Sequence, residues 1–198
     1  MFRTWRMLLA GLMWVGFLVP ATVSGQEKSG PPQLEFPPSL GTLNYVERNT
    51  YQQPELGYSV RYAGANGLKA DIYLYDLGRS GLGTGEAGPD VREHLVEVIR
   101  DVFLMEKRGY YREVRVLTEE TMNWATVHGR VPLLHAVLEY SQTSASRGGE
   151  EKPLVSHVLL ATYQDHFFKI RFTYAEADRI EGAASLRLFL QDCGELLR

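Results

Sequence analysis

Short runs in which apolar, β-branched and aromatic residues alternate with polar ones recur along the chain. They predict β-strands, because neighbouring side chains of a strand point to opposite faces. Asn66 and Gly67 separate two of these runs and are typical of the tight turn of a β-hairpin. Another pair of runs turns near Gly129. The predicted strands cover 43–51, 56–63, 68–77, 110–117, two strands within 122–143, 154–163 and 167–174.

Two other segments repeat apolar residues every three or four positions, which predicts amphipathic helices. The first follows Asp90, which can form a capping box with Glu93, and it ends before Gly109. Its apolar side holds positions 91, 95, 98, 99, 102 and 105. The second helix is expected to begin at Asp178 and carries Leu186, Leu190, Cys193 and Leu197 on one side.

The predicted order is three strands, a helix, about five strands and a helix. Connections between successive strands are too short for the crossovers that parallel strands need. We therefore expect the α+β class, with a mainly antiparallel sheet of about six to eight strands and two main helices packed on it. Residues 43–198 form this single domain.

The opening hairpin and the order of elements resemble the PsbP-like superfamily. The hairpin reads GYSVRY at 57–62 and ADIYLYD at 70–76, and the resemblance extends over residues 43–197. This superfamily includes DcrB-like periplasmic proteins and the PsbP subunit of the photosynthetic oxygen-evolving complex. The resemblance implies a non-catalytic binding or assembly factor. It transfers no functional residue, since no site motif matches.

The first 25 residues have the pattern of a secretory signal peptide. Arg3 and Arg6 precede an uncharged apolar run over 7–19, and small residues lead to an expected cut after Gly25. The alternative is an uncleaved membrane tether, but the run is shorter than the ~20 residues that span a bilayer. Residues 26–42 hold four prolines and predict a flexible or extended linker.

The signal pattern and the composition together limit the expected location of the protein and the class of partner that it binds. Export predicts a periplasmic or secreted protein with no membrane span after cleavage. The single cysteine, Cys193, excludes an intramolecular disulfide. Removal of Arg3 and Arg6 changes the formal net charge from −3 to −5, and no basic run is present, so nucleic acid is not an expected partner.

A glycine-rich segment follows the second predicted hairpin strand. Gly83 to Gly88 spells G-x-G-x-x-G, which binds dinucleotides when it joins a parallel strand directly to a helix. Here the strand belongs to a hairpin, and the glycines all precede the helix. The favoured interpretation is a mobile loop that closes over a partner through Arg79, Gly81, Gly83 and Gly85.

One register of the later strands would gather polar residues on one face of the sheet. In this register Glu139 would lie opposite His157. A turn over 164–166 would then place alternate residues of the next strand on the same face. The polar residues of this face would be His135, Glu139, His157, Lys169, Arg171 and Thr173. Such a face could bind a metal or an anionic ligand. The alternative is the ordinary solvated face of an antiparallel sheet.

The sequence favours an exported, non-catalytic binding or accessory protein of the cell envelope. Its partner would be an envelope protein or a small ligand, and no catalytic residue, metal site or cofactor is predicted. The predicted binding residues are Arg79, Gly81, Gly83, Gly85, His135, Glu139, His157 and Arg171. The alternative is a metal-dependent or hydrolytic enzyme that uses the His135, Glu139 and His157 cluster. A structural factor of the envelope is a third class.

Overall fold

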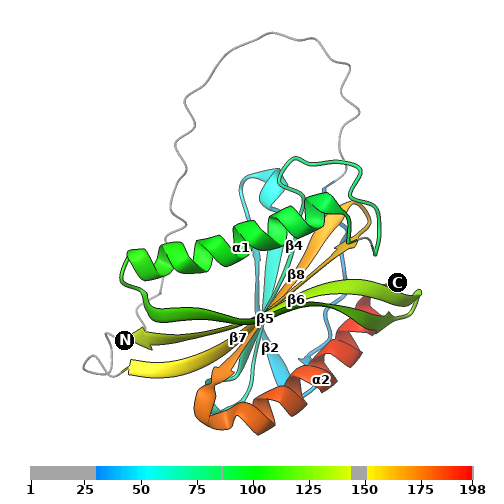
Figure 1. Ribbon diagram of the computed structural model, residues 1–198. Helices are drawn as coiled ribbons and strands as arrows, with labels where there is room; N and C mark the ends of the chain where they lie inside the picture. The colour runs from blue at the N-terminus through cyan, green and yellow to red at the C-terminus, as the bar shows by residue number, and fades with distance from the viewer. Residues whose placement is uncertain (1–29, 86, 144–150, 198) are drawn as a thin grey trace.

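The computed structural model describes residues 30–85, 87–143 and 151–197. These residues form one eight-stranded antiparallel sheet and two α-helices (Figure 1). The predicted α+β class and the mainly antiparallel sheet are therefore confirmed. The predicted signal peptide, 1–25, lies outside the described residues.

The elements follow the order of four strands, a helix, four strands and a helix. The strands are β1 (Ser39–Leu40), β2 (Leu43–Thr50), β3 (Tyr58–Ala63), β4 (Lys69–Tyr75), β5 (Tyr111–Thr126), β6 (Gly129–Thr143), β7 (Glu151–Tyr163) and β8 (His166–Ala175). The helices are α1 (Pro89–Lys107) and α2 (Arg179–Leu196), with single 3-10 turns η1 (Pro54–Leu56), η2 (Ala65–Gly67) and η4 (Glu176–Asp178). The predicted order differs because β1 was not foreseen. In addition, β5 unites two predicted strands across irregularities in its pairing.

Two four-stranded meanders meet in the middle of the sheet. The strand order is β1-β2-β3-β4-β8-β7-β6-β5, and every neighbouring pair is antiparallel. Strands that are consecutive in the chain are neighbours in the sheet, except for β4 and β5, which α1 separates. In the middle of the sheet β4 pairs with β8 instead. Because β8 lies in the middle of the sheet, the side chains on its two faces lie in two different parts of the interior.

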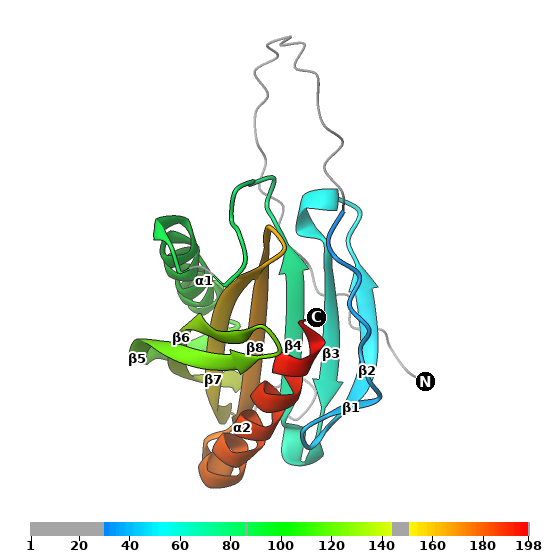
Figure 2. The same ribbon diagram turned by 90° about the vertical axis from the view of Figure 1, so that its right-hand side faces the viewer.

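The interior consists of two apolar clusters, one on each side of the sheet. Phe189 and Cys193 of α2 belong to one cluster with Ile72 of β4. Leu95 of α1 and Val158 of β7 belong to the other. Figures 1 and 2 show α1 and α2 on opposite sides of the strands. Each cluster thus joins one helix to one face.

The turn between β7 and β8 is one residue shorter than predicted. Tyr163 pairs with His166, so that only Gln164 and Asp165 form the turn. Their φ angles are 46° and 62°, which is the left-handed conformation of a two-residue turn of the I′ type. The predicted turn also included His166, because neither residue of the true turn is glycine or asparagine.

This difference moves Arg171 to the other face of the sheet. Val158 lies opposite Arg171, whereas His157 lies opposite Phe172. A shift of one residue exchanges the faces of a strand. The expectation that Lys169, Arg171 and Thr173 share a face with His157 is therefore wrong.

The described part of the expected linker, residues 30–42, contacts the sheet directly. It contains β1, and two tyrosines of β3 hold the segment before it. Tyr58 donates a hydrogen bond to the carbonyl of Pro32 at 2.8 Å, and Tyr62 donates one to Pro37 at 2.7 Å. Residues 30–42 therefore pack against the same sheet as the strands that follow them.

Neither helix in the described ranges has the combination of length and apolar character that a membrane span requires.

Gly182 of α2 packs closely against Tyr174 of β8, and this contact predicts how a substitution at Gly182 changes stability. A Cβ there would lie 2.4 Å from Cγ of Tyr174, whose hydroxyl is tied to His157. We expect Gly182→Ala to lower the free energy of unfolding by about 1–3 kcal/mol, although alanine favours helices. Gly30→Ala is the control, since its methyl would meet no atom of the described residues within 4 Å. Denaturant unfolding that shows equal stability of Gly182→Ala and the unchanged chain would contradict this packing.

Candidate functional site

The predicted binding residues are distributed over three places and do not form one site. Gly81, Gly83 and Gly85 lie in the connection between β4 and α1. His135 and His157 lie on the side of the sheet that α2 covers, and Arg171 lies on the side of α1.

The glycine-rich connection is joined to the turn between β7 and β8. The amide of Leu82 donates to Oδ1 of Asp165 at 2.5 Å, and the amide of Asp165 donates to the carbonyl of Gly83 at 3.0 Å. The amide of Gly85 donates to the carbonyl of Thr162 at 2.8 Å. Leu82 is also buried, so these hydrogen bonds and its burial attach the segment to the turn between β7 and β8.

Arg79 belongs to a half-buried network that the sequence did not reveal. Nε2 of His94 lies 2.6 Å from the hydroxyl of Tyr75, and Nδ1 lies 2.9 Å from Oε2 of Glu97. Arg79 pairs with the same carboxylate oxygen at 3.4 Å. Burial lowers the pKa of His94, while the hydrogen bond with Glu97 opposes that shift.

The burial of His94 could have been read from its position. It lies three residues after Val91 and next to Leu95, within the apolar stripe of the helix.

A continuous hydrogen-bonded chain runs through the predicted histidine cluster. Oε1 of Glu120 lies 3.1 Å from Nδ1 of His135, and Nε2 of His135 lies 2.9 Å from Nδ1 of His157. Nε2 of His157 lies 2.9 Å from the hydroxyl of Tyr174. A carboxylate can only accept, so a consistent assignment has each histidine donate from Nδ1 and accept at Nε2. Both rings are then neutral, and all four ring nitrogens are occupied.

Glu139 shares the face of the two histidines but does not contact them. It lies opposite Val155, two positions from the predicted partner His157. Its carboxylate forms ion pairs with Arg115, at 3.3 Å, and with Arg179. A two-residue shift preserves the face, which explains why the predicted face was right while the predicted contact was not.

The histidine cluster is not arranged as a metal centre. Within 30–85, 87–143 and 151–197, no group of three or more His, Cys, Asp or Glu side chains is placed to hold a metal ion. In addition, a ring nitrogen of His135 or His157 would have to give up its present hydrogen bond before it could bind a metal.

Arg171 lies on the other face among hydroxyl groups. Its Nε donates to Oγ of Ser156 at 3.2 Å, and its Nη2 donates to the hydroxyls of Tyr140 and Tyr111 at 3.0 and 3.3 Å. No carboxylate of the described residues forms an ion pair with it. Lys169, two positions earlier, also has its amine beside aromatic rings, of Tyr73 and Tyr75.

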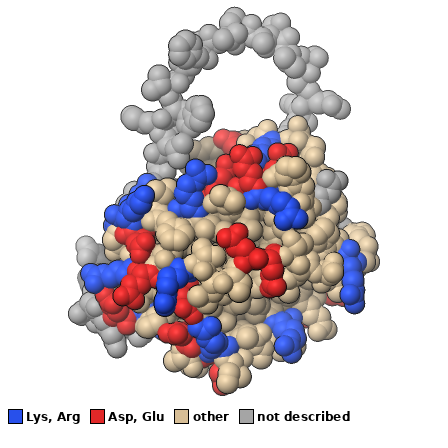
Figure 3. All heavy atoms as spheres, viewed as in Figure 1, with Lys and Arg blue, Asp and Glu red and all other residues tan. Residues whose placement is uncertain are grey.

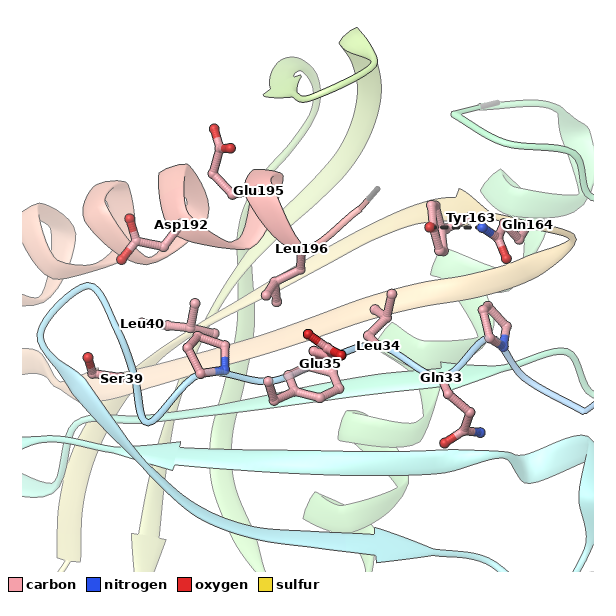
Figure 4. A pocket seen from close by; sticks show the side chains of 13 residues that line it. Gln33, Leu34, Glu35, Ser39, Leu40, Tyr163, Gln164, Asp192, Glu195 and Leu196 are labelled. Carbon is pink, nitrogen blue, oxygen red and sulfur yellow. Dashed lines mark hydrogen bonds between the residues drawn. The ribbon is translucent and has the colours of Figure 1, made fainter.

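A groove lies between the N-terminal segment and the end of α2. Its volume is about 800 Å³, within the usual range of ligand sites. Figure 4 shows the N-terminal segment along one side, α2 along the other, and Tyr163 and Gln164 at one end. Its lining residues are Pro32, Gln33, Leu34, Glu35, Phe36, Pro37, Ser39, Leu40, Tyr163, Gln164, Asp192, Glu195 and Leu196.

The charged side chains among the described lining residues of this groove are acidic. Glu35, Asp192 and Glu195 contribute carboxylates, and the described lining residues include no Lys, Arg or His. The carboxylate of Asp192 also joins α2 to the N-terminal part of the domain. The amide of Gly41 donates a hydrogen bond to Oδ2 of Asp192 at 2.6 Å. The sequence did not predict this groove, because its two sides come from opposite ends of the domain.

The exposed charges elsewhere are mixed. Figure 3 shows basic and acidic side chains interspersed on the face that carries α1. This face has no extended basic surface of the kind that nucleic-acid binding requires.

Comparison of the chain with models of known protein families found no match, and a search of curated proteins found none either.

The hydrogen-bonded series of side chains Glu120, His135, His157 and Tyr174 predicts that the stability of the folded protein depends on pH. Burial lowers the pKa of His157 to about 3, and the smaller electrostatic effects of its neighbours His135 and Arg179 act in the same direction. The unfolded chain binds this proton near pH 6.5 and the folded chain does not, so stability falls as the pH drops below 6.5. The loss between pH 7 and pH 5 should be about 2 kcal/mol, or roughly 4–8 °C in Tm.

Thermal unfolding of His157→Gln measures this contribution. The variant should be less stable at pH 7 but should lose less Tm between pH 7 and pH 5 than the unchanged chain. His128→Gln, at an exposed position, is the matched control and should keep the original pH dependence. Equal pH dependence in His157→Gln and the unchanged chain would exclude a buried neutral His157.

Proposed function

We propose that this chain is an exported, non-catalytic binding protein of the cell envelope, and that its groove binds an extended basic segment of a partner protein. The proposal includes the removal of residues 1–25 as a signal peptide and a periplasmic or secreted location. It also includes a PsbP-like assignment for the domain, which rests on the resemblance of the sequence at 57–62 and 70–76.

The observation that carries this proposal is the combination of shape and charge in the groove. Apolar side chains such as Leu34, Leu40 and Leu196 lie between carboxylates contributed from both sides. A segment that alternates apolar and basic residues would bury its apolar side chains against the leucines and bring a cation to Glu35. Complementary charges of this kind select the partner and accelerate its association.

The contacts of the histidine cluster favour binding over the enzymatic alternative. A general base or a metal ligand needs a nitrogen that faces the substrate or the metal. In His135 and His157 each ring nitrogen instead has a hydrogen-bond partner within the chain, and Glu139 is held by two arginines.

A peptide titration tests the groove. We expect a short fluorescent peptide of alternating lysine and valine to bind the purified chain, and a glutamate–valine peptide not to bind. Glu35→Lys should weaken the first interaction about tenfold or more, because a like charge replaces an opposite one. Glu181→Lys, at an exposed position of α2 outside the groove lining, is the charge-matched control and should bind normally.

A photo-crosslinker at Ser39 extends the test to the native envelope. The crosslinked partner should disappear in Glu35→Lys and persist in Glu181→Lys. Equal affinity of the two peptides, or equal crosslinking by the two variants, would contradict the proposed groove function.

A further inference from the structure

A second, smaller cavity lies between α1 and the centre of the sheet. Its volume is about 190 Å³. It is lined by Tyr73, Val98, Asp101, Val102, Met105, Val158, Lys169 and Arg171. The helix contributes positions spaced three and four apart, so one stripe of α1 faces the strands here.

Two cations of β8 point to the same side of the sheet at this cavity. Lys169 lies opposite Tyr73 on β4, and Arg171 lies opposite Val158 on β7. Both cations are partly removed from water, and residues of one strand two positions apart share a face. Placing two like charges together in such surroundings is unfavourable unless an anion compensates them.

The described residues provide only weak compensation for these charges. The Lys169 amine lies 4.3 Å from the ring centre of Tyr73 and 5.1 Å from that of Tyr75. Arg171 donates to neutral hydroxyls only, and neither cation forms an ion pair with a carboxylate of the described chain. Asp71, opposite Arg171, is already paired with Arg61 at 2.7 Å.

The pKa of Lys169 also indicates that the positive charges at this cavity are only weakly compensated. Burial, followed by repulsion from Arg171, lowers the pKa of Lys169 to about 8. Asp101 and Asp71 act in the opposite direction, but their attraction is the smaller effect. An anion held at this place would raise the pKa again, because it would stabilise the charged amine.

We propose that Lys169 and Arg171 form a binding site for a small organic carboxylate with a short apolar tail. The carboxylate accepts hydrogen bonds from the Lys169 amine and the Arg171 guanidinium, which bind anions strongly when they are partly desolvated. The tail packs against Val98, Val102 and Met105 of α1. Asp101 at the lining disfavours a ligand with a larger negative charge, such as phosphate.

Calorimetry with three probes tests this site in the purified chain. Isovalerate should bind, whereas isoamyl alcohol, of similar shape but uncharged, and inorganic phosphate should not. Lys169→Gln should weaken isovalerate binding about tenfold or more, because it removes one charged hydrogen bond. Lys107→Gln, exposed at the end of α1, should leave the affinity within about twofold.

A second variant separates loss of the site from loss of the fold. Val98→Phe keeps both cations but fills the cavity, so it should also abolish isovalerate binding while Tm stays near that of the unchanged chain. NMR titration of the Lys169 amine should show its pKa rise when isovalerate is present.

Absence of isovalerate binding, equal binding of isoamyl alcohol, preference for phosphate, or unchanged affinity in Lys169→Gln would each overturn the proposal. These outcomes are independent of the peptide titration, because the groove and the cavity share no lining residue.

Discussion

The arrangement of this domain depends on the two-residue turn between β7 and β8. Gln164 and Asp165 both adopt left-handed φ angles, which few residues other than glycine and asparagine favour. The turn fixes the pairing of Tyr163 with His166, and the alternation of the strand then determines every later side chain of β8. Phe168, Ile170 and Phe172 enter one apolar cluster, while Lys169 and Arg171 emerge on the other face.

The contacts of the turn explain why an unusual conformation persists. The glycine-rich corner surrounds it: Leu82 donates to the Asp165 side chain, and Asp165 donates to the carbonyl of Gly83. Gly83 itself has a φ of 68°, where a side chain would add strain. The motif that resembled a nucleotide loop thus has a structural part, which is to hold the register of the central strands.

Much of the fold could be predicted from local patterns, whereas the sites could not. The hairpin at Asn66 and Gly67 and both helices followed from turn chemistry and apolar spacing. The faces of β6 and β7 were also right, because the apolar residues of those strands allow only one. Arg171 was misplaced because Gln164 and Asp165 carry no strong turn signal. The groove was missed because Glu35 and Glu195 come from opposite ends of the domain and line the same groove only in the folded structure.

Cross-strand NMR contacts test the register of β7 and β8 most directly. The account predicts nuclear Overhauser effects that link Val158 to Arg171 and Leu160 to Lys169, as expected for the two-residue turn. Contacts that link Leu159 to Arg171 and Ala161 to Lys169 would contradict it. They would return both cations to the face of His157, and the cavity beside α1 would lose its charges.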